Sequence, residues 1–437
     1  MKTSLLFFGV FLLLLASPNG FPEEYHTYDE MVSELNNLNK AYSDITRLEI
    51  IGESYEGRKV YAMVVTDNPS MDENEPQVLY FAAHHAREAI TVEVVMYFLN
   101  HILSNYESDP EVRRLVDERE LWFVPMVNPD GHVKVEKGFF GWRKNTNPPD
   151  GVDLNRNYDY HWLNDKTSSD NPYSEIYRGE APFSEAETQN MKRLLEENSF
   201  ILALDYHSYG GYIAYPYSQE ERYRKEMRIF DAIAREISEK LDYRIDNSQP
   251  TFGKARGYLF FEKGIYTFLI EVYKHPYRPS WSVFQNFNPP QEKLKEECER
   301  QISVELYVAK IADDLEKAFF PLVLKPLDQN QFELEITNRD ERGREFRVSS
   351  SSSVKFSEEN FKLKPQKRKN LRVEVESEGL VEIFVESEGG LNSVVFENKI
   401  LNTDFESDFT KNDYQKKLIL IIAILILGIL ALNRIRK

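Results

Sequence analysis

The chain has 437 residues, too many for one ordinary hydrophobic core, so two or more domains are expected. Its formal net charge of −18 argues against nucleic acid as a partner. The single cysteine, Cys298, excludes an internal disulfide and a zinc cage built from cysteines. Any zinc site in this chain must therefore use histidine, aspartate and glutamate.

Both ends of the chain carry apolar runs. At the N-terminus, Lys2, the run 5–16 and the turn-forming residues after it predict a secretory signal peptide over residues 1–20. No clean small-x-small cleavage site follows the run, so an uncleaved N-terminal anchor is the alternative.

The second apolar run occupies residues 418–432. At about 1.5 Å per residue it spans roughly 22 Å, short of the ~30 Å bilayer core. The basic side chains that flank it can extend toward the lipid headgroups and close that gap. We expect one transmembrane anchor at 418–433 and a cytoplasmic tail at 434–437, which would place the bulk of the chain outside the cell. A buried C-terminal helix is the alternative.

Residues 21–319 alternate between apolar strands and helical segments. Strand-like runs cover 121–127, 200–205 and 265–271, and a long helix is expected over 291–318. Strands interleaved with helices over about 300 residues predict one large α/β domain.

Two Ser-x-x-Glu sequences, at 184–187 and 218–221, have the spacing of capping boxes. We therefore expect a helix to begin at each. The second would carry Ile229, Ile233 and Ile237 on one apolar face.

The pattern changes at residue 320. From there to residue 402 the apolar segments are short and alternate with polar residues, as in 332–336 and 371–375. This pattern predicts a small β-sandwich domain, followed by a polar linker at 403–417. We find no catalytic constellation in this part of the sequence.

The stretch 78–88 places polar side chains where a strand gives way to a helix. Its apolar run predicts a buried strand and ends in His84, His85, Arg87 and Glu88. Such strand ends are the usual place for sites in open α/β sheets. His85 and Glu88 form an H-x-x-E pair that can reach one zinc ion, leaving positions for a distant ligand and a water. Taken alone, the pair is also typical of a solvated loop.

Two further groups lie on strand-like segments. His207 follows the run 200–205, although a lone histidine there is also typical of a structural role. Glu271 lies inside the very apolar segment 265–272, where a carboxylate is costly unless it is paired or functional. Burial would raise its pKa toward the range useful for a general base.

A polar cluster follows a Pro/Gly turn in the middle of this domain. Asp153, Asn155 and Arg156 lie within four residues, and Arg143 lies just upstream. Such clusters are usually solvated loops. Together with a metal and a base, however, they would supply the oxyanion donor and the carboxylate clamp that peptide hydrolysis requires.

Seven motifs, in this order, resemble the zinc carboxypeptidases typified by pancreatic carboxypeptidases A and B. They are HHARE, VNPDGH, WRKN, GVDLNRNY, APFSEAET, DYHSYGG and TFLIEV. The similarity covers roughly residues 25–318, and seven motifs in order are far more specific than any one of them. The resemblance implies a mixed eight-stranded sheet flanked by helices, and a peptidase with one zinc ion per chain.

The resemblance also implies the residues of the metal centre. His85, Glu88 and His207 would bind the zinc ion. His84 would be a neighbour rather than a ligand, because the spacing to Glu88 selects His85. Asp153 would bind the far side of the His85 ring and fix its tautomer.

The remaining roles concern the substrate. Glu271 would be the general base and acid, taking the proton of the zinc-activated water. Arg143 would stabilise the oxyanion. Asn155 and Arg156 would clamp the terminal carboxylate of the substrate. Two further substrate-binding positions of the family are matched by Arg87 and Tyr209.

The segment 249–258 departs from the family pattern. The mobile tyrosine that the family places before the last strand has no clear counterpart there. The same segment lines the pocket for the last side chain of the substrate and here carries Lys254 and Arg256. If either points inward, an acidic C-terminal residue would be preferred by charge pairing. The alternative is that both face solvent.

The sequence thus predicts a membrane-tethered metallocarboxypeptidase whose substrates are peptide or protein C-termini. One alternative is a cell-wall or modified-glutamate peptidase on the same fold, for which Asn155 and Arg156 would be redundant. The other is a non-catalytic surface binding protein, against which the intact ligands, Arg143 and Glu271 argue. The sequence does not indicate an oligomeric state.

Overall fold

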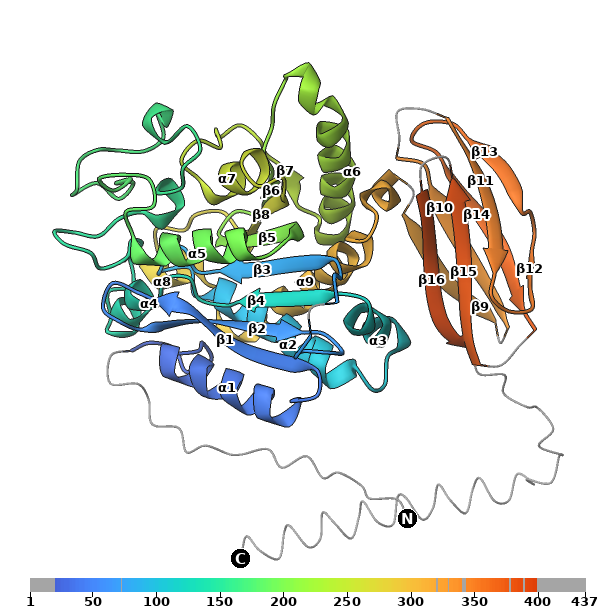
Figure 1. The fold of residues 1–437 in the computed structure, drawn as a ribbon, viewed down its shortest axis with the longest axis horizontal. Helices are drawn as coiled ribbons and strands as arrows, with labels where there is room; N and C mark the ends of the chain where they lie inside the picture. The colour runs from blue at the N-terminus through green and yellow to red at the C-terminus, as the bar shows by residue number, and fades with distance from the viewer. Residues whose placement is uncertain are drawn as a thin grey trace, which may run out of the picture.

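The computed structural model describes residues 20–398 except 72, 320, 329, 340–342, 377–378 and 388–389 (Figure 1). The predicted signal peptide, apart from its last residue, lies outside the described residues, as do the predicted linker, transmembrane anchor and tail. Within the described part of the chain, no helix combines the length and the apolar character needed to cross a bilayer.

The first part of the chain alternates helices and strands, as its periodicity predicts. Its strands are β1 (Thr46–Glu53), β2 (Lys59–Val65), β3 (Gln77–Ala82), β4 (Glu120–Val124), β5 (Phe200–Ser208), β6 (Tyr212–Ala214), β7 (Arg244–Ile245) and β8 (Tyr266–Val272). Its α-helices are α1 (Tyr28–Ala41), α2 (Ile90–Asn105), α3 (Pro110–Asp117), α4 (Pro129–Glu136), α5 (Ala186–Glu197), α6 (Arg224–Leu241), α7 (Ala255–Phe261), α8 (Val283–Phe287) and α9 (Gln291–Ile311). Short 3-10 helices are η1 (Leu154–Arg156), η2 (Trp162–Asn164), η3 (Glu221–Tyr223) and η4 (Leu315–Phe319).

Eight strands form one mixed sheet in the order β1-β2-β4-β3-β5-β8-β6-β7, so the predicted α/β class and eight-stranded sheet are confirmed. The central strands β4, β3, β5 and β8 run parallel, whereas the flanking pairs β1–β2, β2–β4 and β6–β8 are antiparallel. In this register Ala82 lies opposite Tyr206, and His207 lies opposite Glu271. The carboxyl ends of β3, β5 and β8 therefore meet at one edge of the sheet.

Helices cover both faces of this sheet because its central strands are apolar on both. Along β3, Val78, Tyr80 and Ala82 pack into a core shared with α1, α2, α6 and α9. Leu79 and Phe81 point the other way, into a core closed by α5 and α7. This alternation follows from the two-residue period of a strand. Burial on both faces fixes the strands, and with them the residues at their ends.

The second part of the chain consists of two four-stranded antiparallel sheets, which agrees with the predicted β-sandwich (Figure 1). The first sheet has the order β12-β14-β10-β9 and the second β13-β11-β15-β16. Their bounds are β9 (Leu322–Asp328), β10 (Gln331–Thr337), β11 (Arg344–Ser350), β12 (Val354–Phe356), β13 (Asn360–Leu363), β14 (Arg368–Val375), β15 (Gly379–Ser387) and β16 (Gly390–Asn398). Alternate residues of each sheet are buried, as with Val373 in β14 and Ile383 in β15.

Ion pairs attach the β-sandwich to the α/β domain. Arg339, which follows β10, donates to Glu236 at 2.6 Å and to Glu239 at 2.7 Å, both on α6. Arg114 of α3 donates to Glu382 of β15 at 2.5 Å. Arg339 and Glu236 are both buried, so this pair is shielded from the screening that weakens surface ion pairs.

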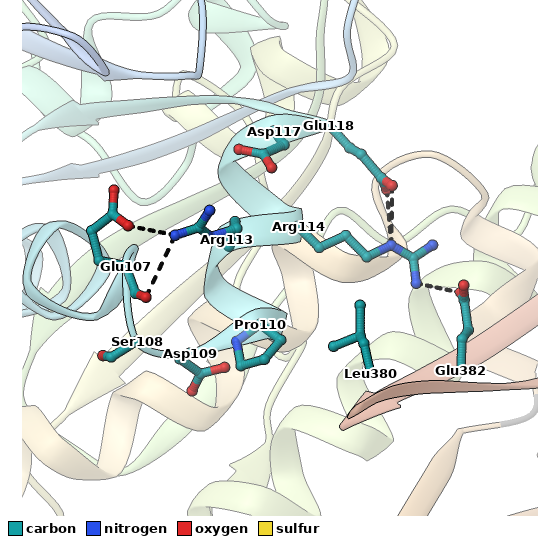
Figure 2. Close-up of a pocket in the computed structure, with 10 residues that line it drawn as sticks. All are labelled: Glu107, Ser108, Asp109, Pro110, Arg113, Arg114, Asp117, Glu118, Leu380 and Glu382. Atoms are coloured by element: carbon teal, nitrogen blue, oxygen red, sulfur yellow. Dashed lines mark hydrogen bonds and ion pairs between the residues drawn. The ribbon is translucent and has the colours of Figure 1, made fainter. Parts of the chain in front are cut away.

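An open hollow of about 540 Å³ lies between α3 and β15 (Figure 2). Its two arginines are already paired, Arg113 with Glu107, and Arg114 with Glu118 and Glu382. None of the site residues predicted from the sequence lines it. The hollow therefore belongs to the contact between the two domains.

Two predicted helix starts are wrong. The helix α5 begins at Ala186 rather than at Ser184, and it has no side-chain cap; the Ser184 hydroxyl instead accepts from Asn157 at 3.0 Å and donates to Glu185 at 2.7 Å. After Ser218, the 3-10 helix η3 precedes α6, and neither η3 nor α6 has a side-chain cap. The predicted buried positions on the face of α6 are nevertheless confirmed.

The predicted long helix over residues 291–318 is too long. The helix α9 ends at Ile311, and η4 follows it as a separate short turn. Between them, Asp313 pairs with Arg119 at 3.1 Å. This contact to a neighbouring segment holds the chain in a bend that local periodicity does not reveal.

Candidate active site

The turn after β3 carries His84 and His85 to the edge of the sheet. Ala83 has a positive φ of 56°, an uncommon conformation that bends the chain sharply at the strand end. Asn128 holds this bend, since its backbone N–H donates to the Ala83 carbonyl at 3.2 Å and its amide to the His84 carbonyl at 3.1 Å. The backbone N–H of Glu88 then donates to the His85 carbonyl at 3.1 Å, which returns its side chain toward the same edge.

His85 and His207 each direct one ring nitrogen, and Glu88 directs its carboxylate, toward a single point. Glu88 Oε1 lies 2.9 Å from His85 Nδ1, Glu88 Oε2 lies 3.0 Å from His207 Nδ1, and the two Nδ1 atoms lie 3.0 Å apart. Ligands at 2.0–2.2 Å from a tetrahedral zinc ion lie about 3.3–3.6 Å from one another, so only a slight expansion is needed. Two imidazole nitrogens facing each other beside a carboxylate form a donor set that fits a zinc ion.

All three groups are buried, and their charges act on one another. Burial would raise the pKa of Glu88, but His85 and His207 hold that pKa well below its usual range. Burial would lower the pKa of His207, but the carboxylates of Asp205 and Glu88 outweigh it and raise that pKa to about 10. Glu88 therefore stays ionised, as binding to a metal requires.

Asp153 lies behind the His85 ring, as the resemblance implies. Its Oδ1 lies 3.1 Å from His85 Nε2, and its Oδ2 accepts two hydrogen bonds of 3.0 Å from Arg143. The first contact places a proton on Nε2 and leaves Nδ1 to bind a metal. Arg143 Nη1 lies 3.8 Å from Glu88 Oε1, so the guanidinium reaches the metal point while Asp153 fixes its orientation.

His84 uses both of its ring nitrogens away from this point. Its Nδ1 lies 3.1 Å from Asp205 Oδ1, and its Nε2 lies 2.8 Å from the hydroxyl of Tyr158. Its ring is stacked against that of His207 with an interplanar angle of 3°. His84 is thus a neighbour of the three-ligand point and contributes no atom to it.

Glu271 lies beside His207 in the parallel register of β8 and β5. Burial and the charge of Glu88 raise its pKa to about 7. A carboxylate with such a pKa can take up a proton near neutral pH and release it again. The structure therefore places a carboxylate on the strand beside His207, with the raised pKa that the apolar strand predicts.

Sequence reasoning misses Tyr212. It lies opposite Glu271 in the antiparallel register of β6 and β8, and its hydroxyl donates to Glu271 Oε1 at 3.1 Å. Burial and the charge of Glu271 raise the pKa of Tyr212 above its usual value, so the hydroxyl keeps its proton. Tyr212 lies in a strand of three residues, and the local sequence pattern does not show with which strand so short a segment pairs.

The other end of the site is cationic. Arg156, Lys254 and Arg256 line the same cleft of about 490 Å³ that the three ligands and Glu271 line. Lys254 and Arg256 are only 4% exposed, so the alternative that both face solvent is wrong. Lys254 Nζ donates to Thr167 Oγ1 at 2.9 Å, and Arg256 Nη2 donates to the Gln249 carbonyl at 3.0 Å.

These cations lower one another's pKa. Burial and the charges of Arg156 and Arg256 lower the pKa of Lys254 to about 7. Burial, opposed by Tyr212 and reinforced by Arg156, lowers the pKa of Arg256 to about 10. Within the described chain, Arg256 Nε is buried without a hydrogen-bond partner. This end of the cleft therefore holds more positive charge than the surrounding carboxylates compensate.

Asn155 and Arg156 lie between the two ends. The Asn155 amide is engaged on both sides, with Nδ2 3.0 Å from His207 Nε2 and Oδ1 accepting from the Ala255 N–H at 3.0 Å. Arg156 uses Nε and Nη1 to bind the carbonyls of Thr167 and Asn155. Those bonds leave the Nη2 side of its guanidinium to face a ligand.

The two further positions implied by the resemblance differ. Tyr209 lines the cleft and stacks on His275, with the ring centroids 4.6 Å apart. Arg87 does not line it; its guanidinium lies 4.3 Å from the ring centroid of Phe287 and donates to the Gly141 carbonyl at 3.1 Å. The structure thus brings Tyr209, but not Arg87, into the cleft.

Comparison with known proteins gives a consistent picture. A zinc carboxypeptidase of Saccharothrix mutabilis subsp. capreolus is 41% identical over 150 residues, which cover 33% of this chain and 34% of that protein. Metallocarboxypeptidase A of Trichophyton tonsurans is 32% identical over 232 residues, covering 49% of this chain and 54% of that protein. The chain therefore spans between a third and about half of the length of these relatives.

The crystal structure of carboxypeptidase A from Helicoverpa armigera shares the fold, with a TM-score of 0.57 and 23% identity over 66% of this chain and 74% of that one. The model of the family described as zinc carboxypeptidase matches residues 31–303, which is more than half of the chain. Since the match includes both ends of the cleft, the chain belongs to the zinc carboxypeptidase family.

Proposed function

We propose that this protein is a metallocarboxypeptidase that removes the last residue of peptides or proteins. The observation that carries the proposal is the convergence of His85, Glu88 and His207 within 3.0 Å of one another, with Glu271 on the adjacent strand. This arrangement is suited to binding a zinc ion next to a carboxylate that can act as a base.

The chemistry divides between the metal and the chain. Zinc, when bound, supplies a Lewis acid that polarises the scissile carbonyl and lowers the pKa of a water molecule. Glu271 takes the proton that this water loses and returns it to the departing amine. Arg143 donates from Nη1 to the oxygen that becomes negative, and loss of one such donor typically raises the barrier by about 3–4 kcal/mol.

Arg156 provides the clamp for the terminal carboxylate. Its guanidinium is oriented by the Thr167 and Asn155 carbonyls, and a preorientated guanidinium binds a carboxylate with two parallel hydrogen bonds. Asn155 contributes less directly, because its amide already contacts His207 and Ala255. We therefore assign Asn155 to orienting Arg156 through its backbone carbonyl, beside its predicted contact with the substrate.

The cationic end supports a preference for an acidic C-terminal residue. A substrate ending in glutamate or aspartate brings two carboxylates, one for Arg156 and one for the pair Lys254 and Arg256. The unpartnered Arg256 Nε would gain an acceptor, and an anion would restore the lowered pKa of Lys254. Apolar last residues would leave these cations buried without compensation, which disfavours their binding.

A panel of N-blocked dipeptides with Glu, Phe, Leu or Arg at the end tests both statements. We expect the peptide ending in Glu to have the highest kcat/KM. Equal or better cleavage of the Phe or Leu peptide would refute the acidic preference but not the carboxypeptidase activity. Failure to cleave any member of the panel with zinc bound would refute the activity and favour a binding protein.

We also propose that the chain is held in a membrane by residues 418–433, with the enzyme outside the cell. The support is the sequence alone, an apolar run with Lys416 and Lys417 on one side and Arg434 and Arg436 on the other. Partition of the full chain into the detergent phase, and of a chain ending at residue 402 into the aqueous phase, is the expected result. An aqueous full-length protein would contradict the anchor.

A further inference from the structure

A buried row of side chains lies behind His207. Asp205 Oδ1 lies 3.3 Å from His207 Nε2 and 3.1 Å from His84 Nδ1, and the Tyr158 hydroxyl lies 2.8 Å from His84 Nε2. Tyr158, His84 and Asp205 are 0% exposed, and His207 is 1% exposed. Solvent therefore takes no part in these contacts. Each N–H or O–H of the row must find its acceptor in a neighbouring side chain.

With a neutral His84 beside an ionised Asp205, one arrangement of protons satisfies the row. Asp205 can only accept, so His84 carries its proton on Nδ1, and His84 Nε2 then accepts from the Tyr158 hydroxyl. If His207 Nδ1 binds a metal, its proton lies on Nε2, and Asp205 Oδ1 accepts that one also. Asn155 Nδ2 lies 3.0 Å from the same Nε2, but it is itself a donor and offers no acceptor.

Asp205 differs from Asp153, the carboxylate behind the other imidazole. Two hydrogen bonds from Arg143 compensate the charge of Asp153. Asp205 has two imidazoles for partners, and its Oδ2 has no hydrogen-bond partner among the described residues. A fully buried carboxylate is stabilised by positive charge beside it, and a metal ion bound to His207 would add to that charge.

We propose that Tyr158, His84 and Asp205 form a relay that fixes His207 in the tautomer presenting Nδ1 to the zinc ion. The three are positioning residues, because each acts through His207 and none touches the substrate. This proposal rests on the proposed function only in requiring that the three-ligand point binds zinc. In this proposal His84, which is not itself a ligand, helps to orient His207 through Asp205.

Zinc affinity of the full-length protein tests the relay without using activity. The apo-protein is titrated with zinc against a chromophoric chelator, and bound zinc is counted per chain. Asp205→Asn keeps the shape but removes the charge, and we expect it to weaken zinc binding by about 10–100-fold, as for other groups that orient metal-binding histidines. His84→Gln and Tyr158→Phe should give successively smaller losses, and Asp205→Glu should recover part of the affinity.

Glu305→Gln is the matched control. Glu305 is a buried carboxyl that accepts a hydrogen bond from Tyr206 at 2.9 Å. Tyr206 lies between Asp205 and His207 in the sequence, but its side chain is on the opposite face of β5. Glu305→Gln should alter thermal stability without altering zinc affinity. If Asp205→Asn does not fold, Tyr158→Phe decides the question, since it removes one hydroxyl and keeps the ring.

Three results would overturn the relay. The relay has no role in zinc binding if folded Asp205→Asn keeps the wild-type zinc affinity. Where that variant does not fold, the same result in Tyr158→Phe leads to the same conclusion. An equal loss in Glu305→Gln would show a general structural effect. A second zinc ion per chain that is lost in His84→Gln would show that His84, Asp205 and His207 hold a metal of their own. A wild-type protein that binds one zinc ion tightly but cleaves no blocked dipeptide would refute the proposed function and leave the relay standing.

Discussion

The charged side chains at the two ends of the cleft have different kinds of partner. At the metal end, Arg143 pairs with Asp153, and Glu88 pairs with His85 and His207, each within 4 Å. At the other end, Lys254 and Arg256 donate to carbonyl and hydroxyl oxygens instead of to carboxylates. The first end thus pairs cations with carboxylates, whereas at the second end these two cations have only neutral acceptors among the described residues.

This difference predicts that variants at the two ends act differently. Burial and the charges of Arg156 and Arg256 lower the pKa of Lys254 to about 7, and its neutral hydrogen-bond acceptors do not compensate its charge. Variants at the metal end should therefore reduce turnover of every substrate alike. Variants at the cationic end should change which substrate is preferred.

Removal of the metal should have the largest effect. A chelator that strips zinc leaves His85, His207 and Glu88 intact but removes the charge that they surround, so turnover should fall below detection for all peptides. The melting temperature should fall as well, because the ion binds the folded state only. Stoichiometric zinc should restore both. Full activity in the metal-free protein would contradict the assignment of the metal end.

Glu271→Gln should come next. The amide cannot accept a proton, so kcat should fall by about 10²–10⁴-fold for every member of the substrate panel. Zinc content should remain at the wild-type level, because Glu271 supplies none of the three atoms that converge. Glu305→Gln is again the control and should keep most of its activity. Loss of zinc together with activity would show that Glu271 acts as a ligand.

Arg256→Leu should change the preference rather than the chemistry. A hydrogen bond to a charged group contributes about 1.5–3 kcal/mol, so kcat/KM for a peptide ending in Glu should fall by roughly 10–150-fold. The Phe and Leu peptides should lose little or gain. Arg244, which also lines the cleft and donates to the Gly210 carbonyl, provides the comparison variant Arg244→Leu. An equal loss of kcat/KM for all peptides would show that Arg256 contributes to the reaction itself and not to the choice of substrate.

The charge on Lys254 should produce a pH dependence that only acidic substrates share. A lysine whose pKa is about 7 is charged below that pH, so its charged fraction falls from about 0.9 at pH 6 to about 0.1 at pH 8. The ratio of kcat/KM for the Glu peptide to that for the Phe peptide should fall several-fold over this interval. In Lys254→Met the ratio should be lower and flat. A ratio that rises with pH in the wild type would contradict the argument.

Tyr212→Phe should have a modest effect that is the same for every substrate. It removes the hydrogen bond of 3.1 Å to Glu271 Oε1 and nothing else at the metal end. One neutral donor to a carboxylate is worth about 1–2 kcal/mol, so kcat should change by roughly 5–30-fold with KM for the Phe peptide unchanged. A change in KM alone would show that the hydroxyl binds substrate instead.

The metal end could be predicted from sequence because its signals are local. His85 and Glu88 lie three residues apart at a strand end, and Glu271 stands out as a charge in an apolar strand. What the sequence could not give depends on which strands pair. The hydroxyl of Tyr212 reaches Glu271 only because β6 pairs with β8.

The position of the cationic pair shows the same limit. The sequence marked Lys254 and Arg256 as charged but left open whether they face the cleft or solvent. They are buried because α7 packs under β8, with Ala255 and Leu259 in the core. Arg87 shows the converse, since its motif matches but the ring of Phe287 takes up its guanidinium.

One measurement tests the central claim most directly. The apo-protein is titrated with zinc while it acts on a blocked dipeptide ending in Glu, offered either as the free acid or as the C-terminal amide. We predict that hydrolysis of the free acid rises linearly to one zinc ion per chain, and that the amide is cleaved at least 100-fold more slowly because Arg156 has no carboxylate to bind. No hydrolysis at full zinc occupancy, or equal cleavage of acid and amide, would contradict it.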